Sequence, residues 1–336
     1  MRKRKFAICD SEAVFACHLM EYMMQRKNVP FEVQVFSEKE SLEKALEEEE
    51  LEMLLVSSGM MDAAMQNLNV GQLLILAEGD VQREWKKFPV IYKYQPSEQL
   101  VAQILDCFVQ SAGEEKLISG KRKSQVFGVY SPLGRCGKTC FALCLGQILA
   151  KKESVLYLNL EEYCGFEELL ERELVSDLLD VMYFLRQKKE NVLMKLSSTV
   201  HRIGALDAVL SVHSPEDLKE VKIEEWEELL DEIACGSGYA YIVLDVGSPV
   251  EEPGVLLSMC DRVYTPVLSG VMEHAKLKHY EKQLKEAELE EVLQKTRYVN
   301  LPFAEPEHTG SYYLERLTEG EMGDFVRTLL ENEVSE

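Results

Sequence analysis

Long apolar runs are missing from this chain of 336 residues. No segment approaches the roughly 18 consecutive apolar residues that a membrane-spanning helix needs. The basic start, Met1–Lys5, is not followed by the longer apolar stretch and the cleavage site of a secretory signal. The sequence therefore predicts a chain that neither spans a membrane nor is exported, and we expect it in the cytoplasm.

Positive charge is scarce. The chain has 37 Lys and Arg residues against 59 Asp and Glu residues, which gives a formal net charge of −22. A phosphate backbone attracts a basic face, so this balance disfavours nonspecific binding of nucleic acid. The short basic clusters Arg2–Lys5 and Lys121–Lys123 are most simply solvated surface. We expect no direct nucleic-acid partner.

Patterns of metal ligands are also missing. The six histidines show no ligand spacing, and the nine cysteines include no CxxC pair. An odd number of cysteines in a chain without an export signal predicts reduced thiols. Cys136, Cys140 and Cys144 recur every four residues. Small residues that pack a helix tightly on a sheet explain this spacing better than a metal site does.

The feature that is present is a turn typical of phosphate binding. Val126–Tyr130 predicts a strand and Cys140–Lys151 predicts a helix, with a Gly-Lys-Thr sequence between them. In this setting the backbone N–H groups bind an anion, Lys138 neutralises the outer phosphates, and the Thr139 hydroxyl can ligate Mg²⁺. The first glycine of the pattern G-x-x-x-x-G-K-S/T is Pro132 here. The predicted cofactor-binding residues are Gly134, Arg135, Cys136, Gly137, Lys138, Thr139 and Cys140.

An acidic residue farther along the chain supports this site. Tyr239–Asp245 predicts a fully buried strand that ends in a carboxylate. Such an aspartate can orient Mg²⁺ beside the threonine of the loop, usually through water, so Thr139 and Asp245 are the predicted metal residues. The alternative is an aspartate that caps the next turn.

The chain is predicted to contain two α/β domains. Residues 1–110 alternate short apolar runs with helical stretches, residues 111–124 predict a linker, and residues 125–336 form the second domain. Ligands of open parallel sheets bind outside the carboxyl ends of the strands. We therefore expect one crevice to be faced by the strand ends Tyr130, Leu160, Asp245, Val267 and Asn300, with Leu301–Phe303 beside an adenine.

The N-terminal domain resembles a response-regulator receiver domain, which has a flavodoxin-like fold. Asp10 and Lys93 match an acid after the first strand and the lysine after the fifth. Ser57 or Ser58 stands where the phosphorylated aspartate would be, and Ala77 replaces the hydroxyl residue. Phosphoryl transfer to a carboxylate requires that carboxylate. The resemblance thus implies a degenerate receiver that serves as an interaction module.

The second domain resembles the MinD/ParA branch of P-loop ATPases, whose deviant loop reads K-G-G-x-G-K-T. Leu133 occupies the position of the family's signature lysine, and Arg135 is a nearby cation at a different position. The family's Asp-x-Asp corresponds to Asn159 and Glu161, so Lys138 and Glu161 are the predicted catalytic residues. Glu161 could instead be a surface residue that leads into a helix. The altered charges predict strong binding of ATP and Mg²⁺ with weak ATPase activity.

The two domains in this order resemble the TadZ and CpaE family of localisation factors for Tad pilus assembly. The resemblance implies a homodimer that gathers at a cell pole or assembly site and recruits the secretion ATPase and other pilus proteins. Glu321–Glu336 is too acidic for a basic amphipathic membrane anchor, so no direct membrane insertion is expected. The alternatives are a ParA-like DNA or plasmid partition ATPase, an atypical response regulator, and an inert scaffold if Pro132 and Arg135 block the loop.

Overall fold

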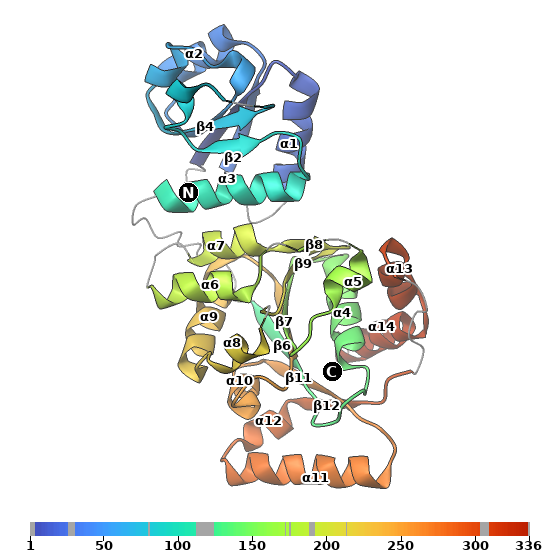
Figure 1. Cartoon of the computed structure of the whole chain (residues 1–336). Coiled ribbons are helices and arrows are strands. Elements are labelled where there is room, and N and C mark those ends of the chain that lie inside the picture. The colour runs from blue at the N-terminus through green and yellow to red at the C-terminus, as the bar shows by residue number, and fades with distance from the viewer. Residues whose placement is uncertain are drawn as a thin grey trace. The chain divides into compact units, whose positions relative to one another are not determined.

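The structure is a computed structural model that describes residues 4–25, 31–79, 81–111, 124–171, 173–174, 176–187, 192–212, 214–302 and 309–334 (Figure 1). The chain divides into two compact units, Met1–Lys116 and Leu117–Glu336. The predicted linker, residues 111–124, lies outside the described residues except at its two ends. Within the described residues, no helix has the length and apolar character that crossing a membrane requires.

The first unit contains a five-stranded parallel sheet with the order β2-β1-β3-β4-β5. This is one of the two common orders of doubly wound sheets. The strands are β1 (Arg4–Cys9), β2 (Phe31–Phe36), β3 (Leu51–Ser57), β4 (Val70–Ala77) and β5 (Val90–Tyr92). The helices are α1 (Ala13–Gln25), α2 (Lys39–Glu48) and α3 (Ser97–Ser111), and the short 3-10 turns are η1 (Ser58–Met60), η2 (Met65–Asn67) and η3 (Arg83–Trp85).

An ion cluster around a buried lysine lies at the carboxyl edge of this sheet. The Lys93 side chain is 0% exposed, and its Nζ lies 2.9 Å from Asp10 Oδ2, 3.2 Å from Glu12 Oε2 and 2.9 Å from Glu78 Oε1. Burial lowers the pKa of Lys93, but hydrogen bonds to the three carboxylates outweigh burial and raise the pKa above its ordinary value. The end of β3 beside this edge carries Ser57, which is also buried.

The second unit contains a seven-stranded sheet with the order β12-β11-β6-β10-β7-β9-β8. All neighbouring strands pair in parallel except β8, which is antiparallel to β9. The strands are β6 (Gln125–Val129), β7 (Val155–Leu160), β8 (His201–Ile203), β9 (Leu206–Val209), β10 (Tyr241–Val246), β11 (Arg262–Pro266) and β12 (Thr296–Val299). The prediction of an α/β chain with mostly parallel sheets is confirmed.

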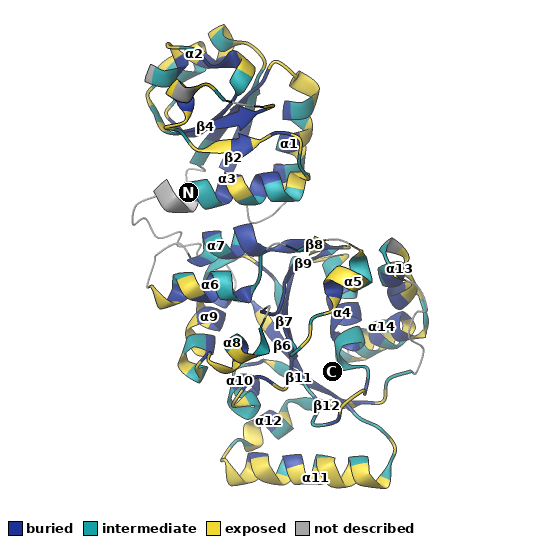
Figure 2. Ribbon diagram, viewed as in Figure 1, coloured by how far each residue is buried: buried dark blue, intermediate teal, exposed yellow. Residues whose placement is uncertain are grey.

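Helices cover both faces of the second sheet, because successive residues of its buried strands point to opposite sides. Leu156, Leu158 and Leu160 of β7 belong to one apolar core, and Val155 and Tyr157 belong to the other. The first core packs against α6 (Leu178–Arg186), α7 (Val192–Thr199), α8 (Pro215–Lys219), α9 (Ile223–Gly236), α10 (Pro253–Ser258), α11 (Val271–Glu286) and α12 (Glu290–Gln294). The second packs against α4 (Lys138–Ala150), α5 (Phe166–Leu170), α13 (Ser311–Glu319) and α14 (Glu321–Val334). Figure 2 shows the buried strands and the largely exposed α11.

The helices between β7 and β8 are short, and the assignments of the two edge strands of the second sheet differ from the prediction. Helix α5 ends at Leu170, before Glu171 with its left-handed φ of 53°, and α6 begins where the Asp177 carboxylate accepts the Leu179 N–H at 2.8 Å. Strand β8 was not predicted. The last strand ends at Val299 rather than at Asn300–Phe303.

Candidate functional site

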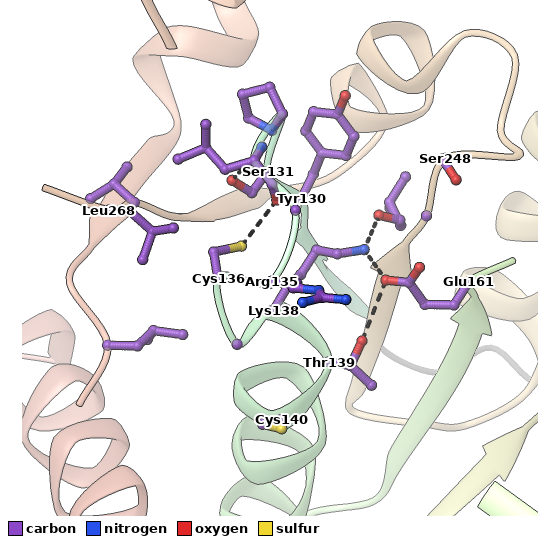
Figure 3. A pocket seen from close by; sticks show the side chains of 18 of the residues that line it. Tyr130, Ser131, Arg135, Cys136, Lys138, Thr139, Cys140, Glu161, Ser248 and Leu268 are labelled. Atoms are coloured by element: carbon purple, nitrogen blue, oxygen red, sulfur yellow. Dashed lines mark hydrogen bonds and ion pairs between the residues drawn. The ribbon is translucent and has the colours of Figure 1, made fainter. Parts of the chain in front are cut away.

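A cavity of about 770 Å³ opens at the carboxyl edge of the second sheet (Figure 3). It lies where β6 passes through a tight loop into α4, and the ends of β7, β10, β11 and β12 border it. Its lining residues are Tyr130, Ser131, Pro132, Leu133, Gly134, Arg135, Cys136, Gly137, Lys138, Thr139, Cys140, Glu161, Val246, Gly247, Ser248, Val267, Leu268, Leu301, Pro302 and Met322. The cavity therefore joins segments from Tyr130 to Met322 at one place.

The loop before α4 is a tight turn with two left-handed residues. Gly137 is the N-cap residue of α4 with a φ of 78°, and Arg135 has a φ of 56°. The left-handed region suits glycine, whereas an arginine there is strained by roughly 1 kcal/mol. Because Gly137 has no side chain to cap the helix, the first N–H groups of α4 are available to an anion.

Short contacts define the remainder of the loop. The Ser131 hydroxyl donates to the Pro266 carbonyl at 2.7 Å and accepts the Leu133 N–H at 3.2 Å. The Cys136 thiol donates to the Leu133 carbonyl at 3.3 Å. The Leu133 side chain is buried, with 5% of the residue exposed. The position that resembles the family's signature lysine therefore holds an apolar residue packed into the protein.

Lys138 is the central cation of the cavity. Its Nζ forms an ion pair with Glu161, donates to the Val246 carbonyl at 2.5 Å, and lies 3.4 Å from Asp245 Oδ1. The Thr139 hydroxyl donates to the same Glu161 oxygen at 3.3 Å, and Figure 3 shows Lys138, Thr139 and Glu161 pointing toward one another. Burial lowers the pKa of Lys138, but Asp245 and Glu161 outweigh burial and raise it, so the lysine stays charged.

Asp245 lies behind Lys138 and is completely buried. Its Oδ2 accepts the Tyr157 hydroxyl at 2.9 Å. Its Oδ1 faces the Lys138 ammonium at 3.4 Å, and no shorter hydrogen bond reaches this oxygen within the described part of the chain. Burial raises the pKa of Asp245, and the Lys138 charge offsets this only in part.

A close approach of two strand ends brings these groups together. Gly247 follows β10, and its N–H donates to the Leu160 carbonyl at the end of β7 at 3.1 Å. A Cβ at Gly247 would lie 2.4 Å from that carbonyl oxygen and 2.7 Å from Glu161 Cα, so only glycine fits without a backbone shift. Glu161 follows β7 and Asp245 lies in β10, so this contact brings both carboxylates within reach of Lys138.

The structure gathers most of the predicted site residues. The seven predicted cofactor-binding residues, 134–140, all line the cavity, and so does Glu161. Asp245 does not line the cavity and lies behind Lys138. Leu301 and Pro302 line the cavity, whereas Phe303 lies outside the described residues. Asn159 is completely buried and does not line the cavity, so the structure gives it a different role from Glu161.

Several lining residues were not predicted. Ser248 and Gly247 follow the predicted strand Tyr239–Asp245 directly, and a glycine just after a strand end is a signal that could have identified them. Met322 comes from α14, which packs against α4. Its contribution depends on tertiary packing, and no local pattern indicates it.

The residues present fit a nucleotide with Mg²⁺. Asp245 Oδ1 is a buried acceptor whose contact with Lys138 is long, at 3.4 Å, and a metal-bound water would supply a closer donor. Thr139 supplies a hydroxyl oxygen at the cavity wall. Among the described residues, no three His, Cys, Asp or Glu side chains gather as metal ligands. Any Mg²⁺ here would therefore take most of its ligands from phosphate and water.

The comparisons with known proteins give only structural matches. No protein-family model matches the chain, and a search of curated proteins finds no match either. A ParA family ATPase from Chlorobium tepidum TLS is 17% identical, with 61% of this chain and 98% of that chain covered and a TM-score of 0.49. A plasmid partition protein from Borrelia burgdorferi B31 bound to AMPPNP is 17% identical, with 63% and 100% covered and a TM-score of 0.45.

The MinD cell division protein from Aquifex aeolicus is 18% identical, with 61% of this chain and 79% of that chain covered and a TM-score of 0.41. The solved structures similar to this chain thus include ParA- and MinD-type proteins.

Proposed function

We propose that the second unit binds ATP with Mg²⁺ in the 770 Å³ cavity. The proposal rests on one observation: the charged Lys138 ammonium lies at the N-terminus of α4, on the wall of a cavity large enough for a nucleotide. A triphosphate would take the N–H groups of the loop and the Lys138 charge. Thr139 would ligate the Mg²⁺, and Asp245 would accept a hydrogen bond from its water. The apolar Leu301, Pro302 and Met322 suit a base.

We propose that this site hydrolyses ATP slowly. Binding uses the loop backbone and Lys138, whereas turnover needs charges aimed at the transition state. Leu133 is apolar and buried where the resemblance places a cation. Glu161 is the carboxylate available to act on water, but Lys138 and Thr139 both engage it.

For the whole chain we propose a localisation and assembly factor of the TadZ and CpaE type. The first unit has the 2-1-3-4-5 strand order of a receiver domain, and Lys93 follows its last strand. It has Ser57 rather than aspartate at the end of β3, which supports an interaction module without phosphorylation. The proposed chain dimerises through the second unit when ATP is bound and recruits pilus secretion proteins to a cellular site.

The test of nucleotide binding is Lys138→Ala, compared with Lys151→Ala at the other end of α4. Isothermal titration with ATP and Mg²⁺ should show binding by the wild-type chain and by the Lys151 variant. The Lys138 variant should bind about 100-fold more weakly or not at all, since it loses a charge-assisted bond to phosphate. Equal affinity of the Lys138 variant and the wild-type chain would refute the site.

A further inference from the structure

Tyr157 forms a hydrogen-bond relay directly behind the cavity. It lies in the middle of β7, next to β10, and is completely buried. Its hydroxyl donates to Asp245 Oδ2 at 2.9 Å, and it accepts a hydrogen bond from Asn159 Nδ2 at 3.1 Å. None of the three side chains Tyr157, Asn159 and Asp245 lines the cavity.

The direction of these hydrogen bonds follows from chemistry. Asn159 Oδ1 accepts the backbone N–H of Glu161 at 3.2 Å, and a backbone N–H can only donate. The amide nitrogen of Asn159 must therefore face Tyr157, where it can only donate. The Tyr157 oxygen is thus an acceptor toward Asn159, and its single proton is directed at Asp245.

This relay assigns different tasks to the two oxygens of Asp245. Oδ2 is occupied by the Tyr157 hydroxyl, while Oδ1 is turned toward Lys138, 3.4 Å from its Nζ. A buried tyrosine hydroxyl without a partner is costly, so the bond to Oδ2 restricts rotation of the carboxylate. Without the relay, the orientation of Asp245 would depend on its interaction with Lys138 at 3.4 Å.

We propose that Tyr157 is a positioning residue that orients Asp245 toward the Mg²⁺ shell of a bound nucleotide, and that Asn159 directs its proton. The inference rests on the proposed ATP and Mg²⁺ site and assigns it two residues that do not touch the ligand. Asn159 stands where the family resemblance implies a carboxylate that positions water. In the structure Asn159 belongs to the hydrogen-bond relay instead, and Glu161 is the carboxylate that lines the cavity.

The test is Tyr157→Phe, with a fluorescent ATP analogue titrated first in EDTA and then at increasing Mg²⁺. Affinity in EDTA should stay within about twofold, because Lys138 and the loop are unchanged. The apparent Kd for Mg²⁺ should rise about 10- to 100-fold, the usual cost of removing a residue that orients a metal ligand. Asn159→Asp should also raise this Kd, since a carboxylate cannot donate and would draw the Tyr157 proton away from Asp245.

Tyr264→Phe is the matched control. Tyr264 is also a buried strand tyrosine in the same sheet, but its hydroxyl donates to Glu333 at 2.8 Å. It should keep the wild-type Mg²⁺ dependence, and circular dichroism should show all variants folded. An unchanged Kd for Mg²⁺ in Tyr157→Phe, with wild-type nucleotide binding intact, would overturn this inference alone. If Tyr157→Phe does not fold, an unchanged Kd in Asn159→Asp overturns it. A wild-type chain that binds no nucleotide would contradict the proposed function and this inference together.

Discussion

Lys93 in the first unit and Lys138 in the second each hold an ammonium group at the carboxyl edge of a parallel sheet. Both are paired with carboxylates that lie at the ends of other strands or just after them, and both have a raised pKa. They differ in access. The Lys93 side chain is 0% exposed and has three carboxylate partners, whereas the Lys138 side chain is 12% exposed on the wall of a large cavity.

The difference shows how similar ion clusters serve stability in one place and binding in another. A lysine whose charge is neutralised by three carboxylates has none left for an anionic ligand. At Lys138 the competing carboxylate on the cavity wall is Glu161, so an anionic ligand in the cavity competes there with one carboxylate rather than three. We therefore interpret the Lys93 cluster as structural and the Lys138 cluster as a binding site.

The largest effect is expected for Lys93→Met. Removing the cation leaves the completely buried Asp10 carboxylate without its positively charged partner and should lower the free energy of unfolding of the first unit by about 3–5 kcal/mol. The chain has two tryptophans, and Trp85 lies in the first unit while Trp226 lies in the second. In a Trp226→Phe background, urea unfolding followed by Trp85 fluorescence reports the first unit.

The exposed lysine of α2, Lys44, supplies the control for this experiment. Lys44→Met should leave the transition within about 0.5 kcal/mol of the parent chain. In the reciprocal Trp85→Phe background, Lys138→Met should destabilise the second unit less than Lys93→Met destabilises the first. Equal losses at Lys93 and Lys44 would contradict a structural role for the first cluster.

The second expected effect concerns the contact that assembles the Lys138 cluster. Gly247→Ala places a Cβ against the Leu160 carbonyl and should destabilise the second unit by about 1–3 kcal/mol, as other overpacked sites do. Thermal unfolding followed by Trp226 fluorescence measures this loss. Gly134→Ala is the comparison, because its Cβ would meet no heavy atom within 4 Å. Equal melting temperatures of the two variants would show that the close approach of β7 and β10 does not matter for stability.

A smaller effect is expected for Glu161→Gln. The neutral amide keeps the size of the side chain but competes less with phosphate for Lys138, so nucleotide affinity in EDTA should rise about fivefold, or ~1 kcal/mol. The slow hydrolysis should fall further, since Glu161 is the predicted catalytic carboxylate. Glu162→Gln, one residue later, should change neither quantity. Weaker nucleotide binding by Glu161→Gln would show that the carboxylate does not compete for Lys138.

No effect at all is expected from a small-molecule phosphodonor. The first unit has serine, not aspartate, at the end of β3, and Lys93 is already paired with three carboxylates. Intact-mass spectrometry after incubation with acetyl phosphate and Mg²⁺ should therefore detect no phosphoryl adduct on this unit. An aspartyl phosphate there would make the first unit an active receiver and remove the contrast between the two clusters.

Much of the fold was predictable because the signals are local. Val126–Tyr130 and Tyr239–Asp245 are short apolar runs bounded by polar residues, and a lysine between such a strand and a helix predicts an anion site. Elements with weak local signals were missed. β8 has three residues and is stabilised by its antiparallel pairing with β9, so its pattern alone could not predict a strand.

The amino-acid sequence by itself determined the chemistry at the loop: a lysine, a threonine and a glycine N-cap between a strand and a helix, because each of these depends on neighbours along the chain. Only the tertiary structure decided what surrounds them. Tyr157 lies 88 positions from Asp245 and binds it because β7 and β10 are adjacent. Met322 reaches the cavity because α14 packs on α4. Contacts between segments distant in sequence depend on which strands and helices become neighbours, and no local pattern encodes that choice.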